Sequence, residues 1–147
     1  VTVSVLYCRL QFLATMPINA DMQCVYGCIG SMGVLSAILG FRMSMFRVAG
    51  SPGEDDPNSE LNKWYLANML HSEWAPVGVG LGLALVAKGT AGKCATARNL
   101  IAIWTTARWA FTLAVLFCDK VAIKAPAMMT MYGTTLGMAG MLLIPSC

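Results

Sequence analysis

The hydrophobic positions of this chain gather into four long runs that short polar links separate. A helix that crosses a bilayer needs about 20 predominantly apolar residues, and each of these runs reaches that length. The pattern predicts helices at 24–46, 62–87, 95–118 and 125–144. We therefore expect an all-α fold, a four-helix transmembrane bundle.

The first residues are apolar as well, but Arg9 interrupts them and Pro17 ends the run. This pattern favours an interfacial arm over a fifth span. We therefore expect an N-terminal arm at 1–23 and one four-helix transmembrane domain at 24–147. The longest link, 48–61, holds Gly, Pro and the acids Glu54, Asp55 and Asp56, as expected for a solvated loop.

Composition supports a membrane protein. The chain is 57% hydrophobic and 12% charged, whereas soluble domains carry about 25% charged residues. The net charge of +3 is spread along the chain without a basic run, which excludes nucleic acid as an expected partner. The lipid bilayer and other membrane subunits are the expected partners. Because the chain begins with Val1, a removed transit peptide is one interpretation, and it favours a thylakoid or inner mitochondrial membrane over the endoplasmic reticulum.

Small residues recur at four-residue spacing in three of the predicted helices. In lipid, such spacing lets two helix backbones approach closely. We expect close packing at Gly78-x-x-x-Gly82, Gly133-x-x-x-Gly137 and Gly33-x-x-x-Ala37.

Six cysteines raise the question of a metal site or a disulfide. Cys24 and Cys28 are four residues apart, but no second Cys/His pair accompanies them, so no metal site is expected. Cys118 and Cys147 both fall near helix ends, and their pairing stays open.

Two charged residues, Glu73 and Arg108, fall inside hydrophobic segments. Charges at bilayer depth are costly and need a partner or a task. Counted along two consecutive antiparallel helices, the two residues reach similar depth. We expect them to meet directly or through one water, as a structural ion pair that fixes helix register rather than as catalytic groups.

Further polar residues precede Glu73 on the same predicted helix. Asn68 and His71 are three positions apart and share a helix face, whereas Glu73 points elsewhere. Asn68, His71 and Glu73 form the candidate set for binding a cofactor, and a bound lipid or pigment is one such ligand. His71 is the one histidine in the chain, and three roles stay open: proton carrier, haem or pigment ligand, and interhelical hydrogen bond.

Four stretches, in this order along the chain, resemble the MAPEG family, the membrane-associated proteins of eicosanoid and glutathione metabolism. They are Gly40-Phe41-Arg42 followed by Arg47, the Gly- and Asp-rich link at 50–55, Glu73-Trp74-Ala75-Pro76, and Ala107-Arg108. The similarity extends from about residue 33 to residue 144. It implies a four-helix bundle, often a homotrimer, with glutathione bound between subunits.

The chain departs from the family pattern at two positions. Catalytic members resemble Arg-Ala-x-x-Asn-x-x-Glu in the second helix, and here Leu66 and Leu70 replace the Arg and the Asn, leaving Glu73. Losing the Arg removes a bidentate clamp for the carboxylates of glutathione. The resemblance therefore implies a non-catalytic, accessory subunit of a larger photosynthetic or respiratory complex. The alternative is a glutathione transferase or peroxidase, in which Arg42 and Arg108 would be the catalytic candidates.

Overall fold

The computed structural model describes residues 20–49, 59–118 and 121–144. Within these residues the fold is entirely helical, which confirms the predicted class. Four long helices account for most of it: α2 (Ala20–Val48), α3 (Glu60–Ala87), α5 (Ala95–Phe117) and α6 (Val121–Leu143). A short helix that the sequence did not predict, α4 (Thr90–Lys93), joins α3 to α5.

The long helices begin and end close to the predicted positions. Three of them are long and apolar enough to cross a membrane: Met22–Val48, Glu60–Ala87 and Ala95–Phe117. The fourth, α6, has 23 residues, and its crossing of the bilayer stays a prediction. Of the predicted N-terminal arm, residues 20–23 instead form the first turn of α2, and residues 1–19 lie outside the described residues. The Glu54–Asp56 cluster and Cys147 lie outside them as well.

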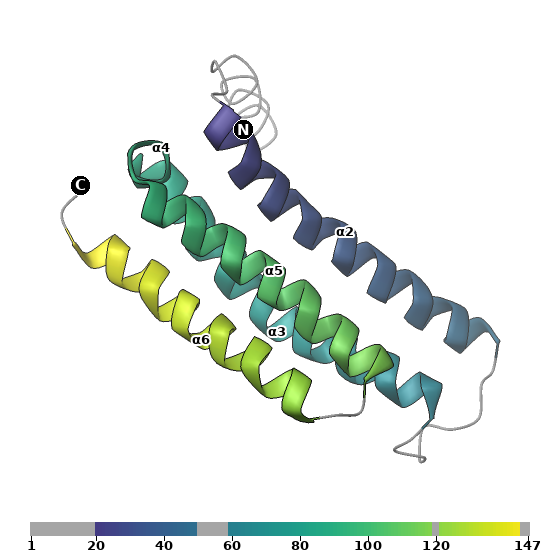
Figure 1. The fold of residues 1–147 in the computed structure, drawn as a ribbon. Coiled ribbons are helices and arrows are strands. Elements are labelled where there is room, and N and C mark those ends of the chain that lie inside the picture. Colours follow the sequence, from purple (N-terminus) through teal and green to yellow (C-terminus); the bar gives the residue numbers. More distant parts are fainter. Residues whose placement is uncertain (1–19, 50–58, 119–120, 145–147) are drawn as a thin grey trace, which may run out of the picture.

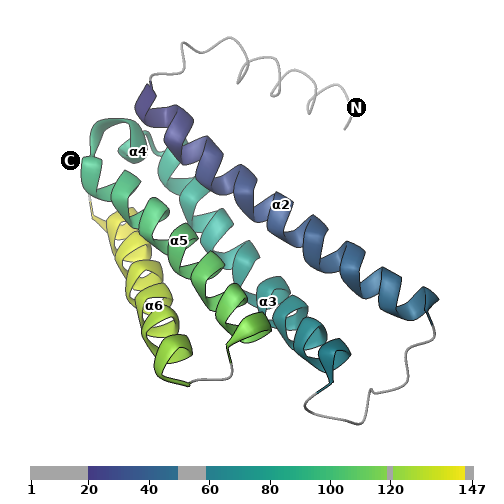
Figure 2. The same cartoon turned by 45° about the vertical axis from the view of Figure 1, so that its right-hand side comes forward.

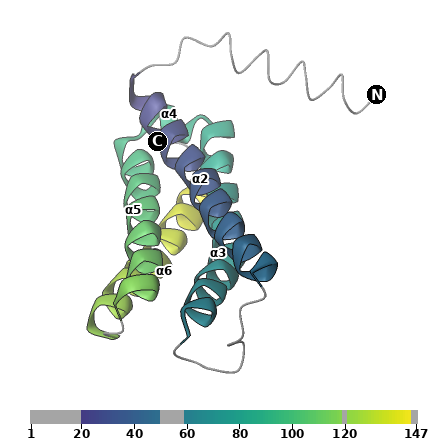
Figure 3. The same ribbon diagram turned by 90° about the vertical axis from the view of Figure 1, so that its right-hand side faces the viewer.

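The helices α3 and α5 occupy the centre of the arrangement. They contact each other, and each contacts both α2 and α6, whereas α2 does not contact α6 (Figures 1 and 2). Figure 3 shows α2 crossing in front of the other helices, with α4 near its beginning. The side chains of α3 and α5 together therefore connect the peripheral helix α2 to the rest of the bundle.

The residues that flank α3 define where the helix begins and ends. The Ser59 hydroxyl accepts a hydrogen bond from the Asn62 amide at 3.1 Å, and Glu60 adds negative charge to the first turn. At the other end Gly89 has φ +77°, a left-handed conformation that glycine adopts without strain. The chain turns there into α4.

Two of the three small-residue motifs bring helices together within this chain. Gly78 packs under the Trp104 indole of α5, and Gly82 lies against Ile29 and Ile101. In α6, Gly137 faces Leu100 of α5, whereas a Cβ at Gly133 would meet no atom within 4 Å, so only half of that motif is used. The third motif differs, because a Cβ at Gly33 would meet no atom within 4 Å and Ala37 is exposed. That face of α2 is not used for packing among the described residues.

Lys88 ties the end of α3 to the end of α6. Its ammonium donates to three backbone carbonyls, those of Met141 at 3.2 Å, Leu142 at 3.0 Å and Ile144 at 2.5 Å. These carbonyls lie in the last turn of α6 and just after it, where helical donors are lacking and the helix dipole favours a cation. Lys88 thus caps a helix that is far from it in sequence.

We expect Lys88→Met to destabilise the bundle by about 1–3 kcal/mol, because several carbonyls lose a charged donor at once. Thermal unfolding in detergent measures the effect. Lys93→Met is the matched control, since Lys93 is exposed and forms no hydrogen bond or ion pair with the described residues. Equal melting temperatures for the two variants would contradict the capping role.

Candidate functional site

A chain of hydrogen bonds crosses the bundle at mid-height and joins α5, α3 and α2. Arg108 Nε donates to His71 Nδ1 at 3.3 Å. His71 Nε2 lies 2.8 Å from the Ser36 hydroxyl, which itself lies 2.9 Å from the Met32 carbonyl. His71 and Arg108 are 2% and 1% exposed. The protein therefore encloses a histidine and a guanidinium at the depth where polar groups are most costly.

The direction of these bonds assigns the tautomer of His71. A guanidinium can only donate, so Nδ1 of His71 must accept, and the ring proton is on Nε2. Nε2 then donates to Ser36, and the Ser36 hydroxyl donates to Met32. A serine nucleophile needs a neighbouring base with a free nitrogen, and His71 does not offer one. The arrangement is a structural connection among three helices.

Of the residues in this cluster, Arg108 has the fewest hydrogen-bond acceptors for its donors. Its Nη1 lies 4.0 Å from the Met131 sulfur, a weak acceptor, and its guanidinium carbon lies 5.7 Å from the centre of the Phe111 ring. Its Nη2 is buried without a hydrogen-bond partner. The cation is held by one imidazole and by polarizable neighbours.

No salt bridge joins Glu73 to Arg108 in the described part of the chain, so the direct form of the predicted contact is absent, and contact through one water stays a prediction. Glu73 is exposed, and the one salt bridge shown by the described residues is elsewhere. The physical reason is rotation about the helix axis, because two residues of α-helix turn Glu73 about 200° away from His71, which faces Arg108. The carboxylate still acts on Arg108 electrostatically from a distance.

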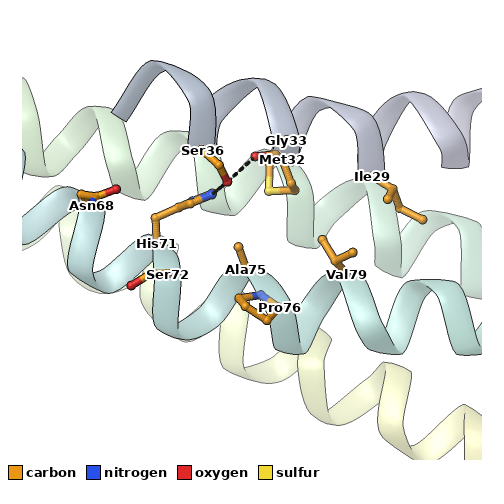
Figure 4. Close-up of a pocket in the computed structure, with 10 residues that line it drawn as sticks. All are labelled: Ile29, Met32, Gly33, Ser36, Asn68, His71, Ser72, Ala75, Pro76 and Val79. Atoms are coloured by element: carbon orange, nitrogen blue, oxygen red, sulfur yellow. Dashed lines mark hydrogen bonds between the residues drawn. The ribbon is translucent and has the colours of Figure 1, made fainter. Parts of the chain in front are cut away.

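A groove of about 430 Å³ runs between α2 and α3 beside His71. Figure 4 shows its polar side chains at one end, and the apolar Ile29 and Val79 at the other. The polar side chains are Ser36, Asn68, His71 and Ser72. As predicted, Asn68 and His71 share this face and Glu73 does not. None of the residues that line the groove is a cation or a carboxylate.

Two of these observations bear on ligand binding. A haem iron or a pigment metal needs an open imidazole nitrogen, whereas both nitrogens of His71 are engaged. The Asn68 carboxamide is half-buried and has no hydrogen-bond partner among the described residues. The groove therefore offers an uncharged polar end to a small amphipathic ligand.

Arg42, the other predicted catalytic candidate, lies outside this groove. Its Nη2 forms an ion pair with Glu60 at 3.0 Å. Its guanidinium stacks over Phe46 at 4.7 Å and faces Trp64 at 5.7 Å. Both charged side chains are partly exposed, at 45% and 65%, so the ion pair adds little stability. Arg42 joins α2 to the beginning of α3.

Sequence reasoning missed Ser36 and Met131 as members of the polar cluster. Both lie on helices other than the one that carries His71, and nothing in their spacing marks them. Cys24 and Cys28 are not in a disulfide. Among the described residues, no group of three or more His, Cys, Asp or Glu side chains is placed to hold a metal ion.

Comparison with known proteins gives one match. The model of the MAPEG family matches residues 25–144, which is most of the chain. No curated protein and no solved structure matches it. The matched region contains all three helices that are long and apolar enough to cross a membrane, except the first residues of α2. The chain is an integral membrane protein that belongs to the MAPEG family.

Proposed function

We propose that this chain is a non-catalytic MAPEG subunit, an accessory component of a larger membrane complex, with all four long helices crossing the bilayer. One observation carries this proposal. No cation lines the groove between α2 and α3, because Arg108 is enclosed behind His71 and Arg42 is paired with Glu60.

Glutathione chemistry needs such cations. A thiol becomes a nucleophile as its thiolate, which nearby positive charge stabilises. The two carboxylates of glutathione also need donors of the kind that arginine supplies. At the positions of the family's Arg and Asn, the chain has Leu66, which is 41% exposed, and Leu70, which is half-buried. This part of α3 therefore presents hydrocarbon where the catalytic pattern has donors.

The proposed setting is an energy-transducing complex of the thylakoid or inner mitochondrial membrane. The composition is hydrophobic, and the charged Glu73 lies on the exposed side of α3. Both features suit a subunit that other membrane subunits surround. Fractionation of organelles followed by native electrophoresis tests this setting. Migration with a complex much larger than a homotrimer supports it, and recovery in the endoplasmic reticulum contradicts it.

The second candidate is a membrane-bound glutathione transferase or peroxidase that acts as a homotrimer. Membership of the family and the unpartnered Asn68 amide in the groove favour it. In that case, Arg42 and Arg108 would have to leave their present contacts to reach the thiolate and the carboxylates.

We expect the purified protein to bind glutathione with a dissociation constant weaker than about 1 mM, which corresponds to about 4 kcal/mol of binding free energy. Titration calorimetry in detergent measures this, and a conjugation assay with a generic aromatic electrophile measures activity. The variant Leu66→Arg/Leu70→Asn restores both donors and serves as the comparison. Tight binding or turnover by the unmodified chain would overturn the accessory role.

A further inference from the structure

Two thiols lie next to each other near the beginning of α2. Cys24 and Cys28 are four residues apart on this helix, and their side chains interact directly. Residues at this spacing are neighbours on one helix face. Cys24 is exposed within this chain and Cys28 is partly buried. The pair therefore extends from the surface of α2 toward its contact with α5.

A buried hydroxyl of α5 lies against the inner thiol. Thr105 contacts Cys28 through its side chain and is 6% exposed. Its Oγ1 has no oxygen or nitrogen partner among the described residues, so the Cys28 sulfur is the acceptor within its reach. A buried donor that lacks a good acceptor is costly. A negatively charged sulfur at Cys28 would remove this cost.

The neighbouring threonines of α5 behave differently. The hydroxyls of Thr106 and Thr112 donate to the carbonyls of the preceding turn, at 2.9 Å and 3.0 Å. Thr105 could satisfy its hydroxyl in the same way without any thiol. Its side chain instead leaves the hydroxyl available to Cys28.

The spacing of the two cysteines does not suit a disulfide. Residues four apart on a helix have Cβ atoms about 5–6 Å apart, whereas a disulfide brings them to about 3.5–4.5 Å. Both cysteines are free thiols. A metal ion bridges a wider gap, since each metal–thiolate bond is about 2.3 Å long in zinc sites and two such bonds separate the sulfurs.

The number and kind of ligands select the ion. In the described part of the chain, no third His, Cys, Asp or Glu joins the pair to make a larger metal-binding group. Zinc sites use at least three protein ligands, so this pair does not form one. Thiolates are soft ligands that favour Cu(I), an ion that forms stable complexes with two sulfur atoms in a line.

The surroundings suit the charge of such a complex. Cu(I) displaces the proton of each thiol, so the ion and two thiolates together carry one negative charge. The N-terminal end of a helix favours negative charge, and a hydroxyl donor strengthens its bond to a charged acceptor. Cys24 is four residues, or about 6 Å, from the start of α2, so the ion can arrive from the headgroup region.

We propose that Cys24 and Cys28 form a two-coordinate site for Cu(I), with the Thr105 hydroxyl donating to the Cys28 thiolate. Binding releases two protons and leaves the oxidation state of the ion unchanged. The site lies within one chain and uses none of the residues discussed for glutathione, so it stands or falls independently of the proposed accessory role.

Competition for Cu(I) tests the proposal. The full chain, reduced and kept free of oxygen in detergent, is titrated with Cu(I) against a chromogenic Cu(I) chelator. We expect one ion per chain, and loss of this ion in Cys24→Ser and in Cys28→Ser. The controls Cys94→Ser and Cys118→Ser should keep it. No saturable binding, binding that survives either substitution in the pair, or equal loss in the controls would overturn the proposal.

X-ray absorption at the copper edge checks the coordination. Two sulfur neighbours are expected, and three or four would contradict a two-coordinate site. Titration with Zn²⁺ under the same conditions should give no comparable binding, and tight zinc binding would contradict the site in the same way.

The hydroxyl has its own matched pair of variants. Thr105→Val keeps the side-chain shape and removes the donor, so the affinity for Cu(I) should fall about tenfold while the stoichiometry stays at one. Thr106→Val, whose lost hydroxyl contacts only the Ala102 carbonyl, should keep the affinity. Thermal unfolding confirms that both variants are folded. Equal affinities would show that Thr105 does not donate to the bound thiolate.

Discussion

Gly78→Ala should disrupt the bundle more than any other single methyl addition. A Cβ at Gly78 would overlap the six-membered ring of the Trp104 indole, which is 2% exposed and enclosed by α3 and α5. The backbone of α3 and the rigid indole cannot both keep their places. Overpacking of this kind costs about 1–3 kcal/mol, and loss of a buried tryptophan's contacts about 3–5 kcal/mol.

The control lies two residues away on the same helix. Gly80→Ala adds the same methyl group at a position where it meets no atom within 4 Å. Alanine also favours helix over glycine, although neighbouring helices outweigh this preference in a bundle. Thermal unfolding in detergent, followed by tryptophan fluorescence, should show a large loss for Gly78→Ala and little change for Gly80→Ala. Equal melting temperatures would mean that Trp104 does not pack over Gly78.

The helix positions could be predicted because they depend on hydrophobic length alone. Runs of apolar residues long enough to span a bilayer located the ends of α2, α3, α5 and α6 to within four residues. The short α4 has no such signal, since it is a turn of helix between two long ones. The close packing at Gly78 also followed from spacing, although its partner Trp104 did not.

The contact of Arg108 could not be predicted in the same way. Counting residues gives the depth of a side chain in the membrane, and Glu73 and Arg108 do share a depth. It does not give the direction of that side chain around the helix axis relative to a neighbouring helix. Glu73 points outward on α3, and His71 points at Arg108. The one polar residue of α2 at this height, Ser36, completes the cluster.

The strongest coupling in the protein should therefore be between His71 and Arg108, with Glu73 coupled only weakly. His71→Leu removes the imidazole that accepts from Arg108 Nε, and Nη2 already lacks a partner. A buried charge deprived of its partner destabilises by about 3–5 kcal/mol. We expect His71→Leu to be the most destabilising substitution in this cluster.

Arg108→Met should be much milder. Methionine replaces the buried cation with a flexible apolar side chain, and such replacements are often neutral or stabilising. His71 would lose one donor, but its Nε2 contact with Ser36 would remain. The double variant His71→Leu/Arg108→Met removes the whole polar contact, so it should be more stable than His71→Leu alone.

Chemical or thermal unfolding of the four proteins in one detergent gives the coupling energy, which should exceed about 1 kcal/mol for residues in direct contact. A parallel cycle with Glu73→Gln in place of His71→Leu should give a coupling within about 0.5 kcal/mol of zero, as for sites that share no contact. The opposite order, strong coupling of Arg108 to Glu73 and none to His71, would mean that the two charges meet directly. Strong coupling to His71 alone would establish the imidazole as the group that holds the buried cation in place.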